Sequence, residues 1–524
     1  MKQVEVLRKQ IQYYSYIFSV IVLLVLGQTI GNNGLAYLAI ALETIGLFTV
    51  LVGENVADSF GRMIRFRRKR SQYYNVVNLK KCVFFLELVV GAICFLLLLF
   101  LADVIAAKIF GVPNAAFIIR VLSPVILLRM FVTLLTGYFQ SFGAHIPVAV
   151  TCVLRQVLFL VLGRSFCFKL YDYGVNVAAL LKNDDFKGMY AAVGLALAMV
   201  ITEVVIFTGL LIFYFLSDPS YDRKRCNNGL QKTEDLRANI LNFTQVNAKG
   251  IGIAFVKRLF PLLALIALVQ LEDMGMYYGK YLLICSIPML LIGARYYLLY
   301  ARLNSVIKTK DNRAIRENIS IGIQYAWCIG ILATVLLAVL APQLVQAFFD
   351  GDTVLTTILQ HGSILIVATS FLSYLVVVHV AHNRHLTWFL TLLGTAVVFV
   401  LLCLLMSGRM GSAVLAIVYA GEIALIVGAV VLCILTMSQY RVQLEYIPIF
   451  VLPLICVGVA GVIVLLLCNL LAPHIGNGVC LWLGLLLGSV LYIVFLGVCR
   501  VFSENEIDQL YGKYGKMLLS VIFK

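Results

Sequence analysis

Long apolar runs separated by short polar segments extend along nearly the whole sequence. A hydrocarbon core about 30 Å thick needs roughly 20 helical residues at about 1.5 Å each. Runs of that length cover residues 13–30, 34–53, 83–103, 119–140, 146–163, 189–216, 250–270, 275–300, 320–340, 355–380, 386–406, 412–437, 447–470 and 479–499. Helices satisfy their backbone hydrogen bonds internally, so the pattern predicts an all-α polytopic membrane protein with about 14 transmembrane helices.

Composition and charge support this prediction. The chain has 524 residues, of which 62% are hydrophobic and 13% are charged, whereas soluble proteins carry about 25% charged residues. The 41 Lys and Arg residues gather in alternate loops, as in the run Arg62–Arg70, which the positive-inside rule relates to cytoplasmic segments. We therefore expect both termini to be cytoplasmic. Contact of this run with membrane lipid headgroups is an alternative role, and nucleic acid is not an expected partner.

The polar stretch 218–249 lies between the sixth and seventh runs and divides the chain. We predict two six-helix lobes around a central cavity, followed by a terminal helix pair. The expected parts are an N-lobe at 1–217, a cytoplasmic linker at 218–249, a C-lobe at 250–440, spans 13 and 14 at 441–500, and an amphipathic cytoplasmic tail at 501–524. Ser503 and Glu506 have the spacing of a capping box at the start of that tail. Residues 164–187 are expected to form the longest outer loop.

Two arginines lie deep in consecutive apolar runs. Arg129 and Arg155 precede and follow the hairpin Gly137–Pro147, and each is roughly 10–14 Å from the end of its run at about 1.5 Å per residue. A cation at that depth is costly and usually faces a polar interior. At 100° per residue, Thr133 and Gln140 share one helical stripe with Arg129.

Other runs also contain charged residues, and two interpretations of them are open. They could neutralise one another across helix contacts, for instance Arg129 or Arg155 with Glu43 or Glu203. Alternatively, they could line a hydrated cavity with excess positive charge, which suits an anionic substrate. On the second interpretation, the substrate-binding residues are Arg129, Arg155, Lys280, Arg295, Gln140 and Thr133, and the residues for charge balance or for coupling to Na⁺ or H⁺ are Glu43, Glu203 and Glu422.

Signatures of an enzyme are scarce in this sequence. The chain has no glycine-rich phosphate loop, and its 13 cysteines include no C-x-x-C pair. His379, His382 and His385 are spaced three apart, but no carboxylate or cysteine accompanies them as a further metal ligand. We therefore expect no enzymatic activity, no metal and no cofactor other than a coupling ion.

The hairpin around the two arginines resembles a known family. The segments Leu122–Ile126, Gly137–Gln140 and Ile146–Val150, with Gln156 after them, are similar to the hairpin between the fourth and fifth helices of polysaccharide flippases of the stage V sporulation protein B type. Span eight and its following loop, residues 281–316, also look like that family. These proteins belong to the multidrug/oligosaccharidyl-lipid/polysaccharide exporter superfamily.

The resemblance implies a function, a location and partners. It implies a flippase that moves an undecaprenyl-pyrophosphate-linked oligosaccharide or peptidoglycan precursor across the bacterial cytoplasmic membrane by alternating access. The expected partners are the lipid-linked sugar, membrane lipids and polysaccharide-assembly enzymes, and the protein is expected to be a monomer. Ser141 stands where the family motif tends to have glycine. The first span has no arginine, which favours a general polysaccharide precursor over lipid II.

Two alternatives to a polysaccharide flippase are open. The first is a cation-coupled multidrug exporter on the same fold, which would favour an acidic cavity rather than one with this many basic residues. The second is a membrane glycan polymerase or acyltransferase, which would need a catalytic outer loop or membrane histidine.

Overall fold

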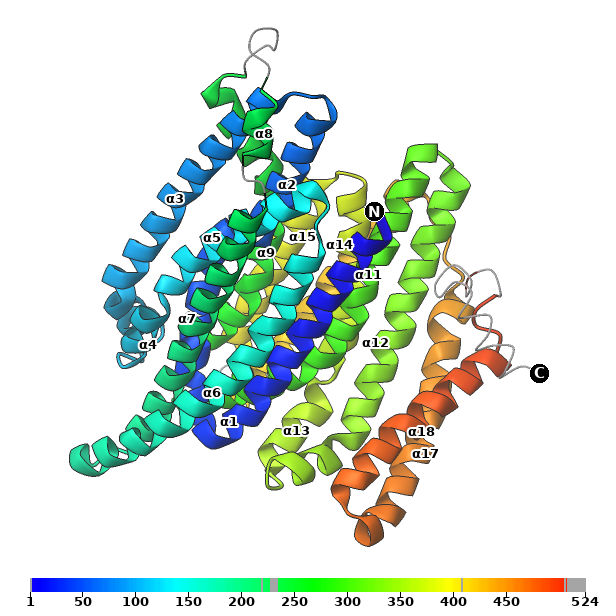
Figure 1. Cartoon of the computed structure of the whole chain (residues 1–524). Coiled ribbons are helices and arrows are strands. Elements are labelled where there is room, and N and C mark those ends of the chain that lie inside the picture. The colour runs from blue at the N-terminus through cyan, green and yellow to red at the C-terminus, as the bar shows by residue number, and fades with distance from the viewer. Residues whose placement is uncertain (1, 218–219, 227–233, 407–408, 504–505, 507–524) are drawn as a thin grey trace. The chain divides into compact units, whose positions relative to one another are not determined.

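The computed structural model describes residues 2–217, 220–226, 234–406, 409–503 and 506, which form helices and the turns between them (Figure 1). Among these residues, 13 helical segments are long and apolar enough to cross a membrane. The first segment, Leu7–Lys69, contains two of the fourteen predicted runs. It includes α1 (Lys2–Val52), which is kinked at Gly31, where φ is 73°, a value that favours glycine. The predicted all-α, multi-span architecture is confirmed.

The chain divides into two compact units, Met1–Lys280 and Tyr281–Lys524. In the first unit, α1 packs against α6 and α7, α2 packs against α5, and α3 packs against α5 and α9. Its helices after α1 are α2 (Glu54–Lys69), α3 (Tyr73–Val104), α4 (Ala115–Leu122), α5 (Pro124–Phe142), α6 (Ile146–Leu181), α7 (Asp185–Leu216), α8 (Tyr221–Lys224), α9 (Leu236–Ala267) and α10 (Leu271–Met274), with π-helical turns η1 (Ile105–Ile109) and η2 (Gly275–Leu282).

In the second unit, the terminal helix pair packs against α12. Tyr492 Oη donates to the carbonyl of Cys328 (3.0 Å), and Gln324 donates to the carbonyl of Val501 (2.7 Å). The helices of this unit are α11 (Leu283–Thr309), α12 (Asn312–Phe348), α13 (Thr353–Gly362), α14 (Ile364–Ala381), α15 (His385–Met406), α16 (Ala413–Tyr440), η3 (Ile447–Val451), α17 (Leu452–Ile475) and α18 (Asn477–Val498).

The predicted hairpin Gly137–Pro147 is the α5–α6 turn. α5 ends at Phe142, and Gly143 follows it with φ of 78°, the left-handed conformation in which many helices end. Pro147 lies in the first turn of α6. Backbone N–H groups in the first turn have no acceptor within the helix, so proline, which lacks this N–H, costs no hydrogen bond there. The backbone thus turns here because glycine and proline occupy the two positions that favour them.

Gly137 lets α2 and α5 approach each other closely. A Cβ at Gly137 would lie 2.9 Å from the carbonyl oxygen of Ala57, and a Cβ at Gly61 would lie 2.9 Å from the carbonyl oxygen of Gly137. Small residues commonly permit such backbone contact between membrane helices. This contact positions the residues that follow Gly137 on α5 against α2.

α6 is longer than the sequence pattern predicted. Residues 164–187 were expected to form a loop, but α6 continues to Leu181. The added turns pack against α7: a Cβ at Gly174 would lie 2.9 Å from the carbonyl oxygen of Phe186, and the rings of Tyr173 and Tyr190 meet at 5.2 Å. Packing against a neighbouring helix therefore extends the helix beyond its apolar run.

The structure describes part of the predicted linker and only the start of the predicted tail. Leu236–Lys249 of the predicted linker belongs to α9, which packs with α1, α2 and α3 in the first unit. Ser503 and Glu506 exchange the hydrogen bonds of a capping box, from Ser503 N to Glu506 Oε2 (2.7 Å) and from Glu506 N to Ser503 Oγ (3.4 Å). Residues 507–524 of the expected tail lie outside the described part of the chain. The lobe boundaries and the tail helix stay predictions.

Replacing Gly137 with alanine should lower stability, because the added methyl group would meet the backbone of α2. Overpacking of this kind typically costs about 1–3 kcal/mol. The measurement is the melting temperature of the purified protein in detergent. Gly209→Ala in α7 is the matched control, since nothing lies within 4 Å of its added Cβ. An equal response of the two variants would contradict the close contact between α2 and α5.

Candidate functional site

Two arginines from neighbouring helices share one carboxylate in the first unit. Arg129 of α5 donates from Nε to Glu203 Oε1 (3.2 Å), and Arg155 of α6 donates from Nη2 to Glu203 Oε2 (3.2 Å). Glu203 lies on α7, and its side chain is 3% exposed, whereas the side chains of Arg129 and Arg155 are 45% and 26% exposed. The carboxylate is therefore enclosed between two guanidinium groups that are only partly covered.

This trio retains positive charge and hydrogen-bonding capacity. Each guanidinium carries five N–H donors, and Glu203 is the only carboxylate among the described residues that pairs with either arginine. With both arginines protonated and Glu203 ionised, the formal charge of the trio is +1. Uncommitted N–H donors and excess positive charge are what a phosphate group would bind.

A second ion pair of the first unit involves a carboxylate on α1. Glu43 Oε1 accepts from Arg258 Nη1 of α9 (3.0 Å) and from the hydroxyl of Tyr278 in η2 (2.7 Å). A Cβ at Gly46 would lie 2.9 Å from Cζ of Arg258, so glycine at this position makes room for the guanidinium. Tyr16 of α1 lies close enough to interact electrostatically with both Arg155 and Arg258. The two clusters are therefore neighbours within the unit.

The residues predicted to form one polar stripe on α5 have different neighbours in the structure. Thr133 is buried one turn from Arg129. With its amide oriented to match its neighbours, Gln140 donates to Asp58 Oδ1 (3.0 Å) and accepts from Arg8 Nη1 (2.9 Å). Lys9 Nζ also donates to Asp58, at 2.8 Å. Gln140 therefore belongs to a network that joins α1, α2 and α5, at the end of α5 far from Arg129.

The remaining predicted site residues lie around the start of span eight and in the second unit. Lys280 lies in η2 and Arg295 in α11, and both are partly buried. In a continuous α-helix, 15 residues at about 100° each would place Lys280 and Arg295 about 60° apart in projection, but η2 is π-helical, so this relation does not hold. Glu422 of α16 is buried and accepts a hydrogen bond from the backbone N–H of Leu365 (3.2 Å). It thus caps the first turn of α14, where unpaired N–H groups favour a carboxylate.

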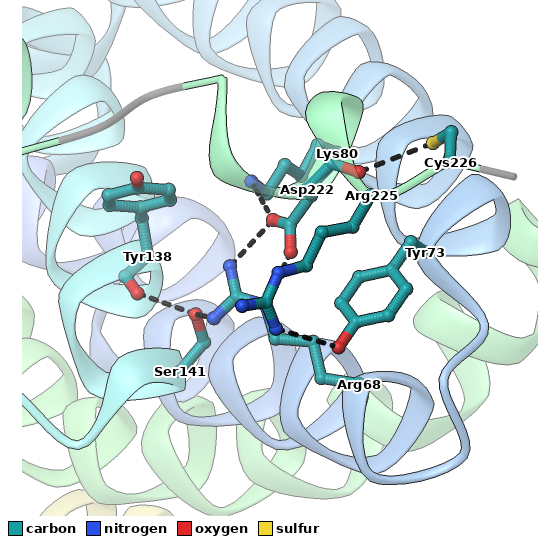
Figure 2. A network of polar contacts seen from close by, with 8 residues as sticks. All are labelled: Arg68, Tyr73, Lys80, Tyr138, Ser141, Asp222, Arg225 and Cys226. Carbon is teal, nitrogen blue, oxygen red and sulfur yellow. Dashed lines mark hydrogen bonds and ion pairs between the residues drawn. The ribbon is translucent and has the colours of Figure 1, made fainter.

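A buried carboxylate after α7 binds two cations from other helices (Figure 2). Asp222 of α8 is 1% exposed, and it accepts from Arg68 Nε (2.7 Å) and Nη2 (2.6 Å) and from Lys80 Nζ (2.5 Å). Arg68 also donates to Ser141 Oγ of α5 (2.9 Å) and lies over the ring of Phe142 at 3.5 Å. These contacts tie together α2, α3, α5 and the segment that follows α7.

The preceding arginine holds the segment that leads into α9. Arg67 donates from Nη2 to Glu234 Oε2 (2.5 Å) and to Asn239 Oδ1 (2.9 Å). The backbone N–H of Glu234 donates to Asn75 Oδ1 of α3 (3.1 Å). Consecutive arginines on α2 thus bind the residues on either side of 227–233.

The structure adds residues that the sequence reasoning did not assign to a site. Arg258 lies visibly within an apolar run, but its partner Glu43 is more than 200 residues away, and the polar contact of Tyr278 has no sequence signal. Asp222 lies in the polar stretch 218–249, which is predicted to be a cytoplasmic linker and not part of a site. One sequence signal could have indicated these ion pairs, namely the excess of basic residues in Arg62–Arg70. An arginine of this run can be buried only if a carboxylate pairs with it.

Two of the three histidines near the α14–α15 turn, His379 and His382, lie against the ring of Tyr440. His379 Nε2 is hydrogen-bonded to Thr436 Oγ1 (3.1 Å), and the ring of His382 lies 4.2 Å from that of Tyr440. Among the described residues, no group of three or more His, Cys, Asp or Glu side chains could hold a metal ion.

Comparison with known proteins gives one family and one fold. The family model described as polysaccharide biosynthesis protein matches residues 10–294. A search of curated protein sequences finds no significant match.

Several solved structures have a similar fold. An inward-facing multidrug resistance MATE family transporter of the MOP superfamily matches with a TM-score of 0.66 and 14% identity, over 82% of this chain and 94% of that one. The lipid II flippase MurJ, in an inward closed conformation, matches with a TM-score of 0.60 and 11% identity, over 94% and 98%. A MOP superfamily transporter from Pyrococcus furiosus matches with a TM-score of 0.57 and 14% identity, over 83% and 94%.

Replacing Asp222 with asparagine should destabilise the protein, because Arg68 and Lys80 would lose their buried counter-charge. Breaking a buried pair in this way typically costs about 3–5 kcal/mol. The matched control is Asp103→Asn, since Asp103 pairs with Arg120 but both side chains are exposed, and exposed pairs contribute only about 0–1 kcal/mol. Thermal unfolding in detergent measures both variants. A melting temperature that falls no further for Asp222→Asn than for Asp103→Asn would refute a structural role for this network.

Proposed function

This chain belongs to the polysaccharide biosynthesis protein family, and from that membership and its paired arginines we propose that it is a membrane flippase. Its substrate is an undecaprenyl-pyrophosphate-linked oligosaccharide or peptidoglycan precursor. The membrane is the bacterial cytoplasmic membrane, with both termini on the cytoplasmic side, as the alternation of basic loops indicates. The activity moves a headgroup across the bilayer and breaks no covalent bond.

The observation that carries this proposal is the incomplete neutralisation of Arg129 and Arg155 within spans. Glu203 compensates one of the two charges and is itself buried. A cation that remains partly uncovered at this depth is costly unless it meets water or an anionic ligand. A pyrophosphate supplies several acceptor oxygens and negative charge, so it suits this pair better than a cationic or neutral ligand does.

In the proposed mechanism, the two guanidinium groups hold the pyrophosphate while Glu203 keeps them oriented. Arg258 is paired with Glu43 but partly exposed, and its remaining N–H groups would bind the rest of the headgroup. Lys280, Arg295, Thr133 and Gln140 stay proposed contributors, and Glu43, Glu203 and Glu422 stay proposed groups for charge balance or ion coupling. A membrane potential acts on each transferred charge with about 2.3 kcal/mol per 100 mV, which is enough to bias alternating access without ATP.

A multidrug exporter is the second candidate, since the MATE family transporter has a similar fold. Cationic drugs need acidic groups at the binding surface, whereas the trio around Glu203 has an excess of positive charge. Binding of anionic rather than cationic ligands therefore distinguishes the two functions.

Replacing Arg129 or Arg155 with alanine should slow headgroup translocation, because each variant removes a phosphate donor. The protein is reconstituted in proteoliposomes with fluorescent undecaprenyl pyrophosphate, and the probe in the outer leaflet is measured by quenching. Loss of a charge-assisted hydrogen bond of about 1.5–3 kcal/mol corresponds to a slowing of roughly tenfold or more. Arginine-to-lysine variants keep the charge and should retain part of the rate.

The matched control is Arg120→Ala, which removes an exposed arginine that pairs with Asp103 and should leave the rate unchanged. Equal rates for the wild type, Arg129→Ala and Arg155→Ala, with intact melting temperatures, would make both arginines structural. Transport of a cationic dye without transport of the pyrophosphate probe would favour the multidrug alternative.

A further inference from the structure

Glu87 occupies an unusual position in the third predicted span. It lies near the middle of α3 (Tyr73–Val104), four residues after the start of the apolar run 83–103, which corresponds to about 6 Å into that run at about 1.5 Å per residue. Apolar residues surround it in the sequence, in Val-Phe-Phe-Leu-Glu-Leu-Val-Val. It belongs to the buried stripe of α3 together with Val83, Gly91 and Cys94, and it is 3% exposed.

The helix contact around Glu87 is apolar. One turn further along α3, a Cβ at Gly91 would lie 3.3 Å from Sδ of Met130 and 3.6 Å from Cδ2 of Leu127 on α5. One turn earlier, the ring of Phe84 lies 6.3 Å from the ring of Phe131, also on α5. The carboxyl group therefore lies where α3 packs against the apolar side of α5.

Among the described residues, Glu87 has no cationic partner. Its Oε2 is buried without a hydrogen bond, and the thiol of Cys94 on the same helix lies close enough to interact with the carboxyl electrostatically. In this respect it differs from Glu43 and Glu203, which are equally buried but paired with arginines.

The charged groups on the helices that pack against α3 do not compensate Glu87. Most of them are committed to other partners, as described above for α1, α2, α4, α5, α8 and α9. In the described part of the chain, burial acts on the Glu87 carboxyl and no cation does, so Lys108 of η1 and Lys257 of α9 do not compensate it either. The committed pairs are Arg129 with Glu203, Arg258 with Glu43, Arg120 with Asp103, Arg67 with Glu234, Arg68 and Lys80 with Asp222, and Arg8 and Lys9 with Asp58.

An ionised carboxylate in this position would be neither solvated nor paired, which is among the most costly arrangements in a protein. The neutral acid avoids that cost by binding one proton. From the burial of Glu87 and its lack of a cationic partner, we propose that Glu87 is a proton-binding site that links transport to proton movement. The link to transport rests on the proposed flippase function, whereas the binding of a proton does not.

The proton balance is simple. While α3 packs against α5, the neutral carboxyl holds its proton as an O–H group. When a conformational change brings water to α3, the proton passes from the carboxyl oxygen to water and leaves a carboxylate, which must take up a proton again before the helices can close around it. The site therefore couples closure of this helix contact to one proton.

The first test is chemical modification by dicyclohexylcarbodiimide, an apolar reagent that reacts with protonated carboxyl groups. Peptide mass mapping of the membrane-embedded full chain at neutral pH should find Glu87 modified, and Glu43 and Glu203, which are paired with arginines, should be unmodified. An infrared pH titration supplies a second measurement, in which the wild type has a carboxylic acid C=O band that Glu87→Gln lacks. An unmodified Glu87 together with no band lost in Glu87→Gln would overturn the proton site.

The second test measures coupling in the same proteoliposomes, with undecaprenyl pyrophosphate as the probe and the membrane potential clamped. One pH unit is worth about a factor of ten per coupled proton, so the leaflet ratio of the wild type should shift by up to that factor. Glu87→Gln resembles the neutral acid and should fold, yet lose the shift. Glu87→Asp should retain it, and Asp103→Asn serves as the control.

The two proposals fail separately. A wild-type protein that does not move the probe would refute the flippase function, while the carbodiimide and infrared results would still decide whether Glu87 binds a proton. A Glu87→Gln variant that moves the probe with an unchanged response to the pH gradient would refute the coupling role.

Discussion

The cost of an unpaired charge inside a helical bundle determines much of the internal architecture of the first unit. Glu203 joins α5, α6 and α7 because it binds arginines from two of them, and Glu43 joins α1, α9 and η2 in the same way. Asp222 fastens α8 to α2 and α3. Each carboxylate thus determines which helices are neighbours. Uniformly apolar helix surfaces would not select their neighbours in a membrane, because the lipid is as apolar as leucine.

The same interactions leave the unit with more positive than negative charge. Glu203 and Asp222 are each bound by two cations, so satisfying the carboxylate does not neutralise the cluster. At Asp222, Arg68 donates to the hydroxyl of Ser141 (Figure 2) and lies over the ring of Phe142, and Lys80 lies over the ring of Tyr138. At Glu203 the arginines remain partly exposed. Clusters of similar composition therefore differ in exposure: the cations of one are covered by other side chains, and those of the other keep guanidinium N–H groups partly uncovered.

Much of the fold could be predicted from the sequence, because span length, glycine and proline act locally. The α5–α6 turn formed where Gly143 and Pro147 indicated, and the capping box formed at Ser503 and Glu506. Interactions between distant helices could not be predicted in the same way. A helical projection placed Arg129 and Gln140 on one stripe, but their partners depend on the register of α5 against α7 and α2. Local geometry also failed where the helix type changed, as in η2, and where packing against α7 extended α6 beyond its apolar run.

The order of the ion-pair partners along the chain has a consequence for biosynthesis. The ribosome delivers Arg129 and Arg155 to the membrane before Glu203, and Glu43 long before Arg258, because the N-terminal part of a chain emerges first. Until the helix that carries the counter-charge has been inserted, the spans that carry Arg129, Arg155 and Glu43 lack the partners that they have in the folded protein. Because of this delay, α7 completes the grouping of α5 and α6, and α9 completes the surroundings of α1. The electrostatic pairs of the mature protein thus also set a sequence of assembly.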